Sequence, residues 1–152
     1  MIVLDTNVVS EVMQGPGTSP ALAWVIAQDT GQLAITAITV MEVSDGLARM
    51  PAGRRRDHVA AQWDLLEGQW LGSFLPLGMH DARLAGAVSA KRRSAGRPIG
   101  MADACIAGIC LAHDATLATR NTRDFEGIGL SLVDPWAAWR AGAGSAAQAH
   151  SP

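Results

Sequence analysis

Short apolar segments, typical of buried strands, alternate along this chain with longer segments in which apolar residues recur at helical spacing. The strand-like segments are residues 2–4, 33–36, 74–77, 116–119 and 130–133. A helix between two strands allows them to lie parallel in one sheet, and it covers a face of that sheet. The alternation therefore predicts an α/β fold of three layers, with a central parallel sheet and helices on both faces.

The expected helices fill the segments between the strands. They span residues 8–13, 20–28, 39–50, 57–69, 80–94 and 101–112. A chain of 152 residues, with 49% apolar and 17% charged residues, has the length and composition of one globular domain, which we place at residues 1–140. From residue 141 onward, Ala, Gly, Ser and Gln predominate and cannot build a core. We therefore expect a disordered C-terminal tail at residues 141–152.

Charge and cysteine content indicate the setting in which the chain works. The net charge of −2 gives no overall attraction to nucleic acid, so such binding must come from local clusters. Cys105 and Cys110 are the only cysteines, and their apolar helical surroundings predict buried thiols in a reducing compartment. The sequence shows neither a secretory leader pattern nor an apolar run long enough to cross a bilayer. These features predict a cytoplasmic protein with no membrane partner.

Acidic residues stand at the junctions between the expected elements. Asp5 directly follows the first strand and is followed by the hydroxyl and amide side chains of Thr6 and Asn7. In open parallel α/β sheets, ligands collect outside the carboxyl ends of the strands. The acids at the later junctions are Glu42, Asp103 and Asp124. Together, four carboxylates suit a hard divalent cation such as Mg²⁺ or Mn²⁺.

Each acid also has a structural explanation. Asp5 suits the N-cap of the next helix, and Thr39 with Glu42 forms the pattern of a capping box. Asp103 near a helix start complements the helix dipole, and Asp124 is a plausible turn residue. Taken singly, these explanations compete well with a functional one. Four such coincidences at four junctions favour a shared site.

Four short stretches of sequence resemble the successive acidic motifs of the PIN-domain family. They are Leu4-Asp5-Thr6-Asn7, Thr39-Val40-Met41-Glu42, Ala102-Asp103-Ala104 and Thr119-Arg120-Asn121-Thr122-Arg123-Asp124-Phe125. Each motif alone is weak, but the four in this order are specific, and the resemblance extends from Met1 to about Trp136. It is closest to the VapC-type toxins of bacterial toxin–antitoxin systems, including their FitB-like branch.

The resemblance implies a PIN-like fold and a Mg²⁺- or Mn²⁺-dependent endoribonuclease that is held inactive by a VapB-like antitoxin. In this interpretation Asp5, Asp103 and Asp124 are metal ligands, and Glu42 holds a metal-bound water or acts as the base. Divalent ions suit this chemistry because they activate water and offset charge on the phosphate. The resemblance also implies a homodimer and larger toxin–antitoxin assemblies. The helices near residues 20–28 and 40–49 are expected to form the antitoxin groove.

The fourth motif offers two candidates for its polar position. Family members carry either an acid where this chain has Asn121, or Asn there and an acid three residues later. We assign Asp124 as the fourth acid and Asn121 as a neighbour that contacts metal, water or substrate. The other expected substrate contacts are Thr6, Asn7, Arg120 and Arg123. Basic runs at residues 54–56 and 91–93 are typical of solvated helix faces, with RNA phosphates as the alternative partner.

Two other classes of protein share some of these features. A phosphotransfer receiver domain also has acids at strand ends, but it needs a lysine at a late strand end. The only lysine here, Lys91, lies in a polar helical run. The other alternative is a catalytically degenerate PIN-like module that binds RNA or a partner protein, for which Asn121 is the only support. The presence of Asp5, Glu42 and Asp103 favours the enzyme.

Overall fold

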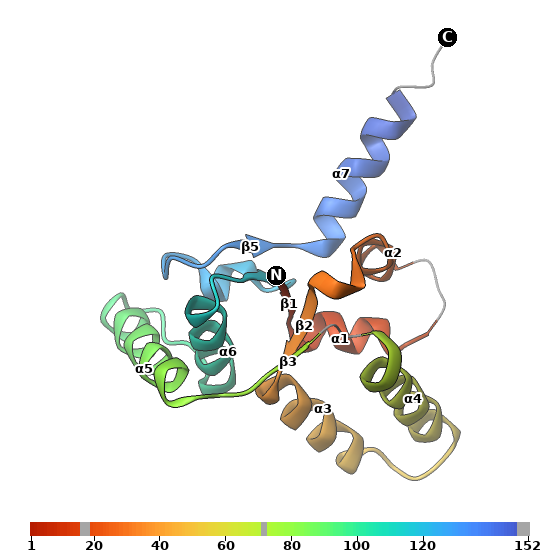
Figure 1. The fold of residues 1–152 in the computed structure, drawn as a ribbon, viewed down its shortest axis with the longest axis horizontal. Helices are drawn as coiled ribbons and strands as arrows, with labels where there is room; N and C mark the ends of the chain where they lie inside the picture. The colour runs from red at the N-terminus through yellow and green to blue at the C-terminus, as the bar shows by residue number, and fades with distance from the viewer. Residues whose placement is uncertain (16–18, 71–72, 149–152) are drawn as a thin grey trace.

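The structure, a computed structural model, describes residues 1–15, 19–70 and 73–148. Its centre is a parallel sheet of five strands in the order β3-β2-β1-β4-β5 (Figure 1). The strands are β1 (Ile2–Leu4), β2 (Leu33–Thr36), β3 (Ser73–Leu75), β4 (Thr116–Ala118) and β5 (Leu132–Val133). From β1 the chain adds strands first on one side and later on the other. This topology confirms the predicted parallel α/β fold.

Helices connect the strands. They are α1 (Thr6–Val12), α2 (Pro20–Ile26), α3 (Ala37–Arg49), α4 (Arg54–Leu65), α5 (Met79–Ser94), α6 (Met101–Ala112) and α7 (Pro135–Gln148). Shorter turns are the 3₁₀ segments η1 (Thr30–Gln32) and η3 (Thr122–Phe125) and the π turn η2 (Leu66–Trp70). Within the part of the chain that the structure describes, no helix is long and apolar enough to span a membrane.

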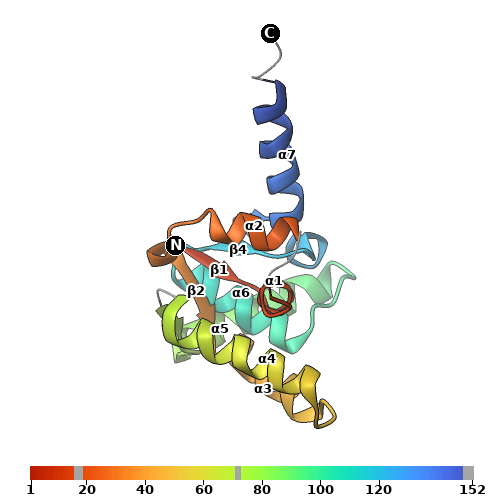
Figure 2. The ribbon, with the colours of Figure 1, turned by 90° about the vertical axis from the view of Figure 1, so that its right-hand side faces the viewer.

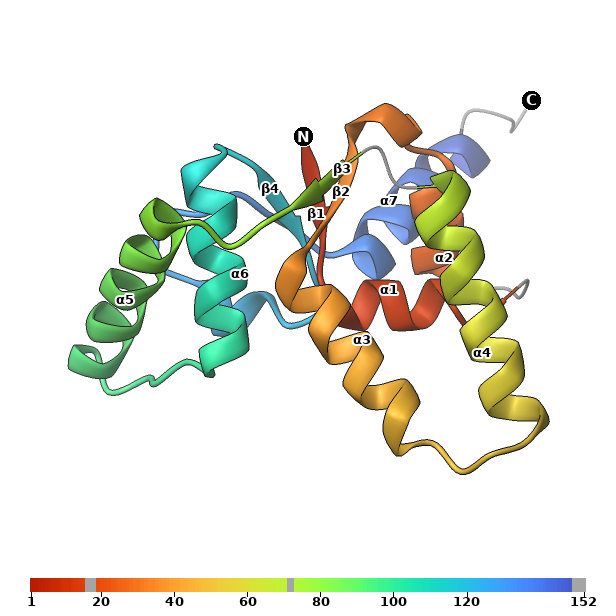
Figure 3. The same ribbon diagram turned by 60° about the horizontal axis from the view of Figure 1, so that its bottom comes forward.

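Two apolar cores lie on opposite faces of the sheet. Successive residues of a strand point to opposite faces. Leu4 accordingly packs with α1 and α2, whereas its neighbour Val3 packs with α6. Figure 3 shows α5 and α6 together on one side of the sheet, and α1 and α2 on the other. The helices therefore cover both faces, as the sequence predicted.

Helices α5 and α6 approach so closely that one position in α6 tolerates no side chain. A Cβ atom placed on Gly108 would lie 2.7 Å from the backbone nitrogen of Ala85, and it would overlap the carbonyl oxygen of Asp81. A glycine inside a helix costs roughly 0.5–1 kcal/mol relative to alanine. Here it permits backbone-to-backbone packing. The two helices are thus joined tightly along their middle.

The C-terminal segment differs from its sequence-based prediction. We expected disorder from residue 141, but α7 continues to Gln148 and projects away from the rest of the molecule (Figures 1 and 2). Proline at the first position suits a helix start, and alanine has the highest helix propensity. The composition argued against a core, but it did not argue against a helix. Residues 149–152 of the expected tail lie outside the described residues.

Candidate functional site

The acidic residues gather at the carboxyl edge of the sheet. β1 lies where the strand order reverses, with β2 on one side and β4 on the other. Such a switch point is where open α/β sheets form their binding crevices. Asp5 follows β1 directly, Glu42 lies in the helix after β2, and Thr119 follows β4. The topology thus brings together residues that are more than one hundred positions apart in the chain.

Asp5 is the centre of a hydrogen-bonded network. Its side chain is only 5% exposed. One carboxylate oxygen accepts the backbone N–H of Thr6 at 2.7 Å. The other accepts the Asn7 side-chain amide and the Thr119 hydroxyl, both at 2.6 Å. Burial raises the pKa of Asp5, and the charge of Glu42 adds to this effect, whereas the three hydrogen bonds lower the pKa in part. The protein therefore holds this carboxylate in one fixed position.

Asp5 also occupies the N-cap position of α1, as the structural explanation required. Its oxygen nevertheless bonds the first N–H of the helix, that of Thr6. N-cap side chains ordinarily serve the second or third. Capping alone does not account for the additional bonds from Asn7 and Thr119 to the second oxygen.

Thr119 is the site residue that sequence reasoning missed. In the sequence it stands only as the first residue of the fourth motif, yet it is fully buried and its hydroxyl joins two distant segments, residues 5–7 and 119–121. The hydroxyl donates to Asp5, and it accepts the side-chain amide of Asn7 at 3.1 Å and the backbone N–H of Asn121 at 3.0 Å. Asn7 in turn accepts the backbone N–H of Arg120 at 3.2 Å. The only signal in the sequence was a hydroxyl residue directly after a buried strand.

Glu42 contacts the same network from α3. The Thr6 hydroxyl donates to its carboxylate at 2.5 Å. The capping box of Thr39 and Glu42, the structural alternative for Glu42, does not form, because α3 begins at Ala37 and its N-cap is Thr36. The Thr36 hydroxyl accepts the backbone N–H of Thr39 at 3.1 Å. Glu42 therefore lies in the second turn of the helix, where no free N–H group requires its carboxylate.

Asp103 lies in the first turn of α6 and is half-buried. Its pKa is raised from 3.8 to about 6, first by burial and then by the charges of Asp5, Glu42 and Asp124. A helix N-terminus favours a negative charge and would lower this pKa. The dipole of α6 therefore does not account for the raised pKa of Asp103. The charges of the other three acids predicted from the sequence thus all act on Asp103 at this edge.

Asp124 belongs to the 3₁₀ turn η3 and has an exposed side chain. Its backbone N–H donates to the carbonyl of Asn121 at 3.0 Å, so the predicted turn is present. The charge of Asp124 nevertheless acts on Asp103. Asn121 is exposed, and only its backbone N–H bonds to the buried network, through Thr119.

The donor set of this edge fits a hydrated Mg²⁺ or Mn²⁺ ion. Among residues 1–15, 19–70 and 73–148, no three His, Cys, Asp or Glu side chains stand close enough together to surround an ion directly. Mg²⁺, however, usually keeps several waters and takes only one or two carboxylates from the protein. The mutual repulsion that raises the pKa of Asp103 is what a cation would relieve. Carboxylate, hydroxyl and amide oxygens are the ligand types that these ions prefer.

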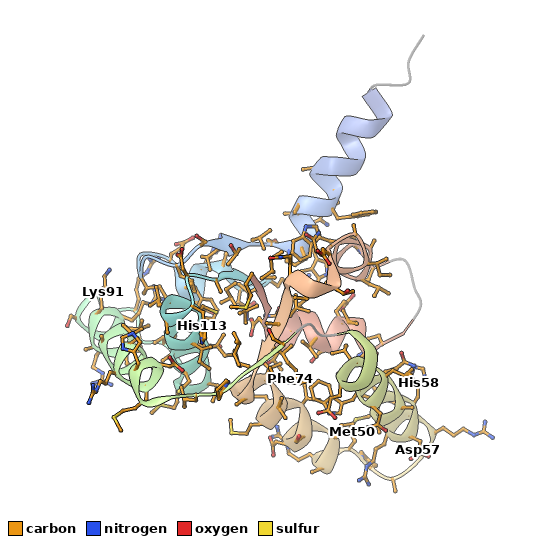
Figure 4. The ribbon with its side chains drawn as sticks, viewed as in Figure 1. Met50, Asp57, His58, Phe74, Lys91 and His113 are labelled. Carbon is orange, nitrogen blue, oxygen red and sulfur yellow. The ribbon has the colours of Figure 1, made fainter. Side chains whose placement is uncertain are left out.

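The basic residues occupy different environments. Arg120 and Arg123 are exposed beside the acidic edge, and the Arg120 guanidinium lies 5.2 Å from the centre of the Trp136 ring. Residues 54–56 are exposed at the start of α4. The run at residues 91–93 is not a uniform solvated face. Lys91 is exposed at the outer side of α5 (Figure 4), whereas Arg92 is buried.

A cavity of about 210 Å³ extends from the acidic edge between α1, α3 and α4. Thr6 and Glu42 lie among its lining residues, and Arg55 of α4 also lines it. Its apolar lining residues are Met13, Val43, Leu47, Met50 and Val59. The sequence predicted a groove between α2 and α3. α3 lines this cavity, whereas α2 lines no part of it and packs against α1 and α7. The groove between α2 and α3 stays a prediction.

The acidic residues line a crevice at the switch point of a five-stranded parallel sheet, and comparison with known proteins identifies the family. The family model described as "PIN domain" matches residues 2–129. The chain belongs to the PIN-domain family. The family and the fold expected from the sequence are thereby confirmed.

Individual relatives cover nearly the whole chain. The protein is 41% identical to VapC ribonuclease Y4jK of Sinorhizobium fredii, over 90% of this chain and 98% of that protein. It is 29% identical to toxin FitB of Neisseria gonorrhoeae, over 90% of this chain and 99% of FitB. The solved structure of FitAB bound to an IR36 DNA fragment superposes with a TM-score of 0.78 at 28% identity, covering 90% of this chain and 96% of that one.

Proposed function

We propose that this protein is a Mg²⁺- or Mn²⁺-dependent endoribonuclease and the toxin of a toxin–antitoxin pair. The observation that carries the proposal is the placement of Asp5 and Glu42, joined through Thr6, at the carboxyl edge of the sheet, where their charges and that of Asp124 act on Asp103. The similarity to a VapC ribonuclease over nearly its full length supports the nuclease activity. The similarity to toxin FitB supports the biological role.

Different residues of the chain would bind the ion, orient its ligands and accept a proton during hydrolysis. Asp5, Asp103 and Asp124 would hold the hydrated ion, in part through its bound waters, and the Thr119 and Asn7 bonds fix the orientation of Asp5. When bound, the ion would activate water and offset negative charge on the scissile phosphate. Glu42 accepts the proton of the attacking water, with Thr6 orienting its carboxylate through their 2.5 Å hydrogen bond.

RNA would approach over the η3 side of the acidic edge. Arg120 and Arg123 are exposed there and supply positive charge for the phosphates that flank the scissile bond. The 5.2 Å approach of Arg120 to the Trp136 ring limits the directions in which its guanidinium points. Asn7 and Asn121 complete the polar contacts of the substrate. These local charges offset the repulsion between RNA and a chain of net charge −2.

A VapB-like antitoxin is the proposed partner. Its amphipathic segment would occupy the cavity between α1, α3 and α4, whose apolar lining leads to Thr6 and Glu42. An occupant of this cavity blocks the acidic edge directly. The structure of the related FitAB complex with DNA supports a larger DNA-bound assembly.

We also propose a homodimer and a cytoplasmic location, as the sequence led us to expect. Large apolar side chains are exposed along the connection from β3 to α5, where Phe74 is 46%, Leu77 38% and Met79 74% exposed (Figure 4 labels Phe74). Contiguous exposed apolar side chains mark candidate interfaces between proteins. Light scattering of the purified chain and of Leu77→Glu tests whether they join two copies.

The decisive experiment measures cleavage of total RNA by the purified chain with Mg²⁺ or Mn²⁺, with excess EDTA, and with Asp103→Asn. Cleavage that requires the ion and the Asp103 carboxylate supports the proposal. Asp64→Asn, a change at an exposed acid of α4, is the matched control and should cut like the wild type. Cleavage that persists in EDTA would refute the metal-dependent mechanism. RNA binding without any cleavage would favour the degenerate binding module.

A further inference from the structure

Arg92 is buried in a run of otherwise exposed basic residues. Its side chain is only 6% exposed, whereas Lys91 and Arg93 on either side are exposed to solvent (Figure 4 labels Lys91). Burying a guanidinium removes it from water at a cost of several kcal/mol unless ion pairs and hydrogen bonds compensate. Within the described part of the chain, Arg92 forms no ion pair with a carboxylate, and its Nε atom has no hydrogen-bond partner. An apolar side chain would fill this space without that cost.

Among the described residues, the Arg92 guanidinium makes one hydrogen bond, and it leads toward the acidic edge. Its Nη1 atom donates to the carbonyl oxygen of Glu126 at 3.2 Å, across 34 positions of sequence. Glu126 directly follows the η3 turn, which carries Asp124. A hydrogen bond from a charged donor is typically about twice as strong as a neutral one. The contact therefore joins the last turn of α5 to the end of the segment that holds the fourth acid.

A second contact reaches Glu126 from the same end of α5. The backbone N–H of Arg97 donates to the carbonyl of Arg92 at 2.9 Å, which folds the chain back after the helix. The Arg97 guanidinium then lies 3.9 Å from the Glu126 carboxylate. This pair is exposed and contributes little on its own. It nevertheless places a second basic side chain from the end of α5 beside Glu126.

The same packing also fixes Asp103. Asp103 lies on α6, and α6 is joined to α5 through the close contact at Gly108. Asp103 and Asp124 are thus both fastened to the α5–α6 pair, one through α6 itself and the other through Arg92. Phe125 anchors η3 in the core, but it does not fix the carbonyl of Glu126, which Arg92 holds.

We infer that Arg92 is a positioning residue for the acidic edge: it holds the Glu126 carbonyl and thereby keeps Asp124 facing Asp103. The inference rests on the proposed function, in which Asp124 helps to hold the ion. Arg92 itself touches neither RNA nor the ion. Its effect reaches the site through the backbone of η3.

The first test requires no metal and no activity. Hydrogen exchange of the segment 119–130 is measured in EDTA for the wild type, Arg92→Met and Arg93→Met, the last being an exposed neighbour on the same helix. Arg92→Met should accelerate exchange in this segment and leave α6 protected, whereas Arg93→Met should match the wild type. Unchanged exchange at residues 119–130 in Arg92→Met would overturn the inference.

The second test separates positioning from simple loss of stability. Mn²⁺ affinity is measured by electron paramagnetic resonance, and kcat and KM for RNA are measured beside it. Arg92→Met should weaken Mn²⁺ binding and lower kcat about tenfold, the scale of losing an outer support of a metal ligand, with KM unchanged. Arg92→Lys keeps a donor for the Glu126 carbonyl and should recover most of both. A purely structural role would lower the melting temperature and leave the Mn²⁺ affinity of folded molecules unchanged.

The third test is a double-mutant cycle. If Arg92 acts through Asp124, then Arg92→Met should weaken Mn²⁺ binding in the wild type but have no further effect in Asp124→Asn. Additive losses would overturn the inference. If the wild type neither binds Mn²⁺ nor cuts RNA, the proposed function fails. If the wild type does both and Arg92→Met is indistinguishable from it, only the role of Arg92 fails.

Discussion

The two sides of the acidic edge stabilise negative charge in different ways. On the β1 side, Asp5 accepts three hydrogen bonds and Glu42 accepts one from Thr6. On the α6 side, no donor among the described residues bonds the carboxylates of Asp103 or Asp124, and the pKa of Asp103 rises to about 6. The first side is organised by the protein before any ion arrives. The second side depends on a cation to compensate its charge.

Glu42→Gln tests the β1 side of this comparison through activity, with little expected effect on stability. Glutamine keeps the size of the side chain and can still accept the Thr6 hydroxyl, but it loses the charge and the ability to take a proton. Cleavage should fall about a hundredfold or more, the scale of losing a general base. The melting temperature should hardly move, because no helix cap depends on Glu42. Cleavage rates of Glu42→Gln near the wild-type value would remove this residue from the catalytic set.

Thr119→Val tests whether the organised side depends on its buried hydroxyl. Valine has nearly the same shape but cannot donate to Asp5 or accept from Asn121. We expect a loss of roughly tenfold to a hundredfold in cleavage or Mn²⁺ affinity. Thr116→Val, in the strand β4 that Thr119 follows, is the control and should remain active. Equal behaviour of the two variants would show that the Asp5 network does not serve the reaction.

Asp5→Asn and Asp103→Asn should both abolish cleavage but move stability in opposite directions. In Asp5→Asn, an amide N–H must face at least one former donor, which costs about 1–2 kcal/mol. In Asp103→Asn, the repulsion from three other carboxylates disappears, so the metal-free protein should become more stable. Melting curves of both variants in EDTA measure the direction of each change in stability. A shift of the same sign in both variants would break the distinction between the two sides.

The smallest expected effect is a pH dependence of stability in the metal-free protein. The folded state holds the Asp103 proton with a pKa of about 6, against the ordinary value of 3.8. The folded state therefore binds more protons than the unfolded state within this window. Stability should decline as the pH rises from about 4 to about 6 and then level off, with Asp5 contributing in the same direction. The decline should be smaller in Asp103→Asn, and Mn²⁺ should reverse it above pH 6. Melting temperatures across this range, with and without Mn²⁺, provide the check.

Much of the fold followed from the sequence because strand and helix periodicities were clear. The parallel sheet is confirmed, and β1 and β2 have the predicted limits. The start of α3 was placed two residues late because Thr36 and Thr39 are both suitable caps, and only the tertiary structure selects between them. The later start is also what made a capping box a possible alternative role for Glu42, and the observed start at Ala37 removes it.

The sequence pointed to those residues of the candidate site whose immediate neighbours in the chain mark them as unusual. Asp5 stood out because a carboxylate directly after a buried strand is unusual. Thr119 was missed because its bond to Asp5 spans 114 positions and leaves no trace in neighbouring sequence. Arg92 was grouped with its exposed neighbours for a similar reason, since the residue that turns inward is decided by the distant η3 segment.

The close approach of α5 and α6 has a genetic consequence. If the chain is toxic, cells that express it without its antitoxin survive only when a mutation disables it. Gly108 lies within a helix, outside the four acidic motifs, yet any side chain there would force apart the two helices that carry Asp103 and hold η3. Survivors should therefore carry substitutions at Gly108 alongside those at the acids. They would identify a dependence on interhelical distance that no inspection of the acidic motifs reveals.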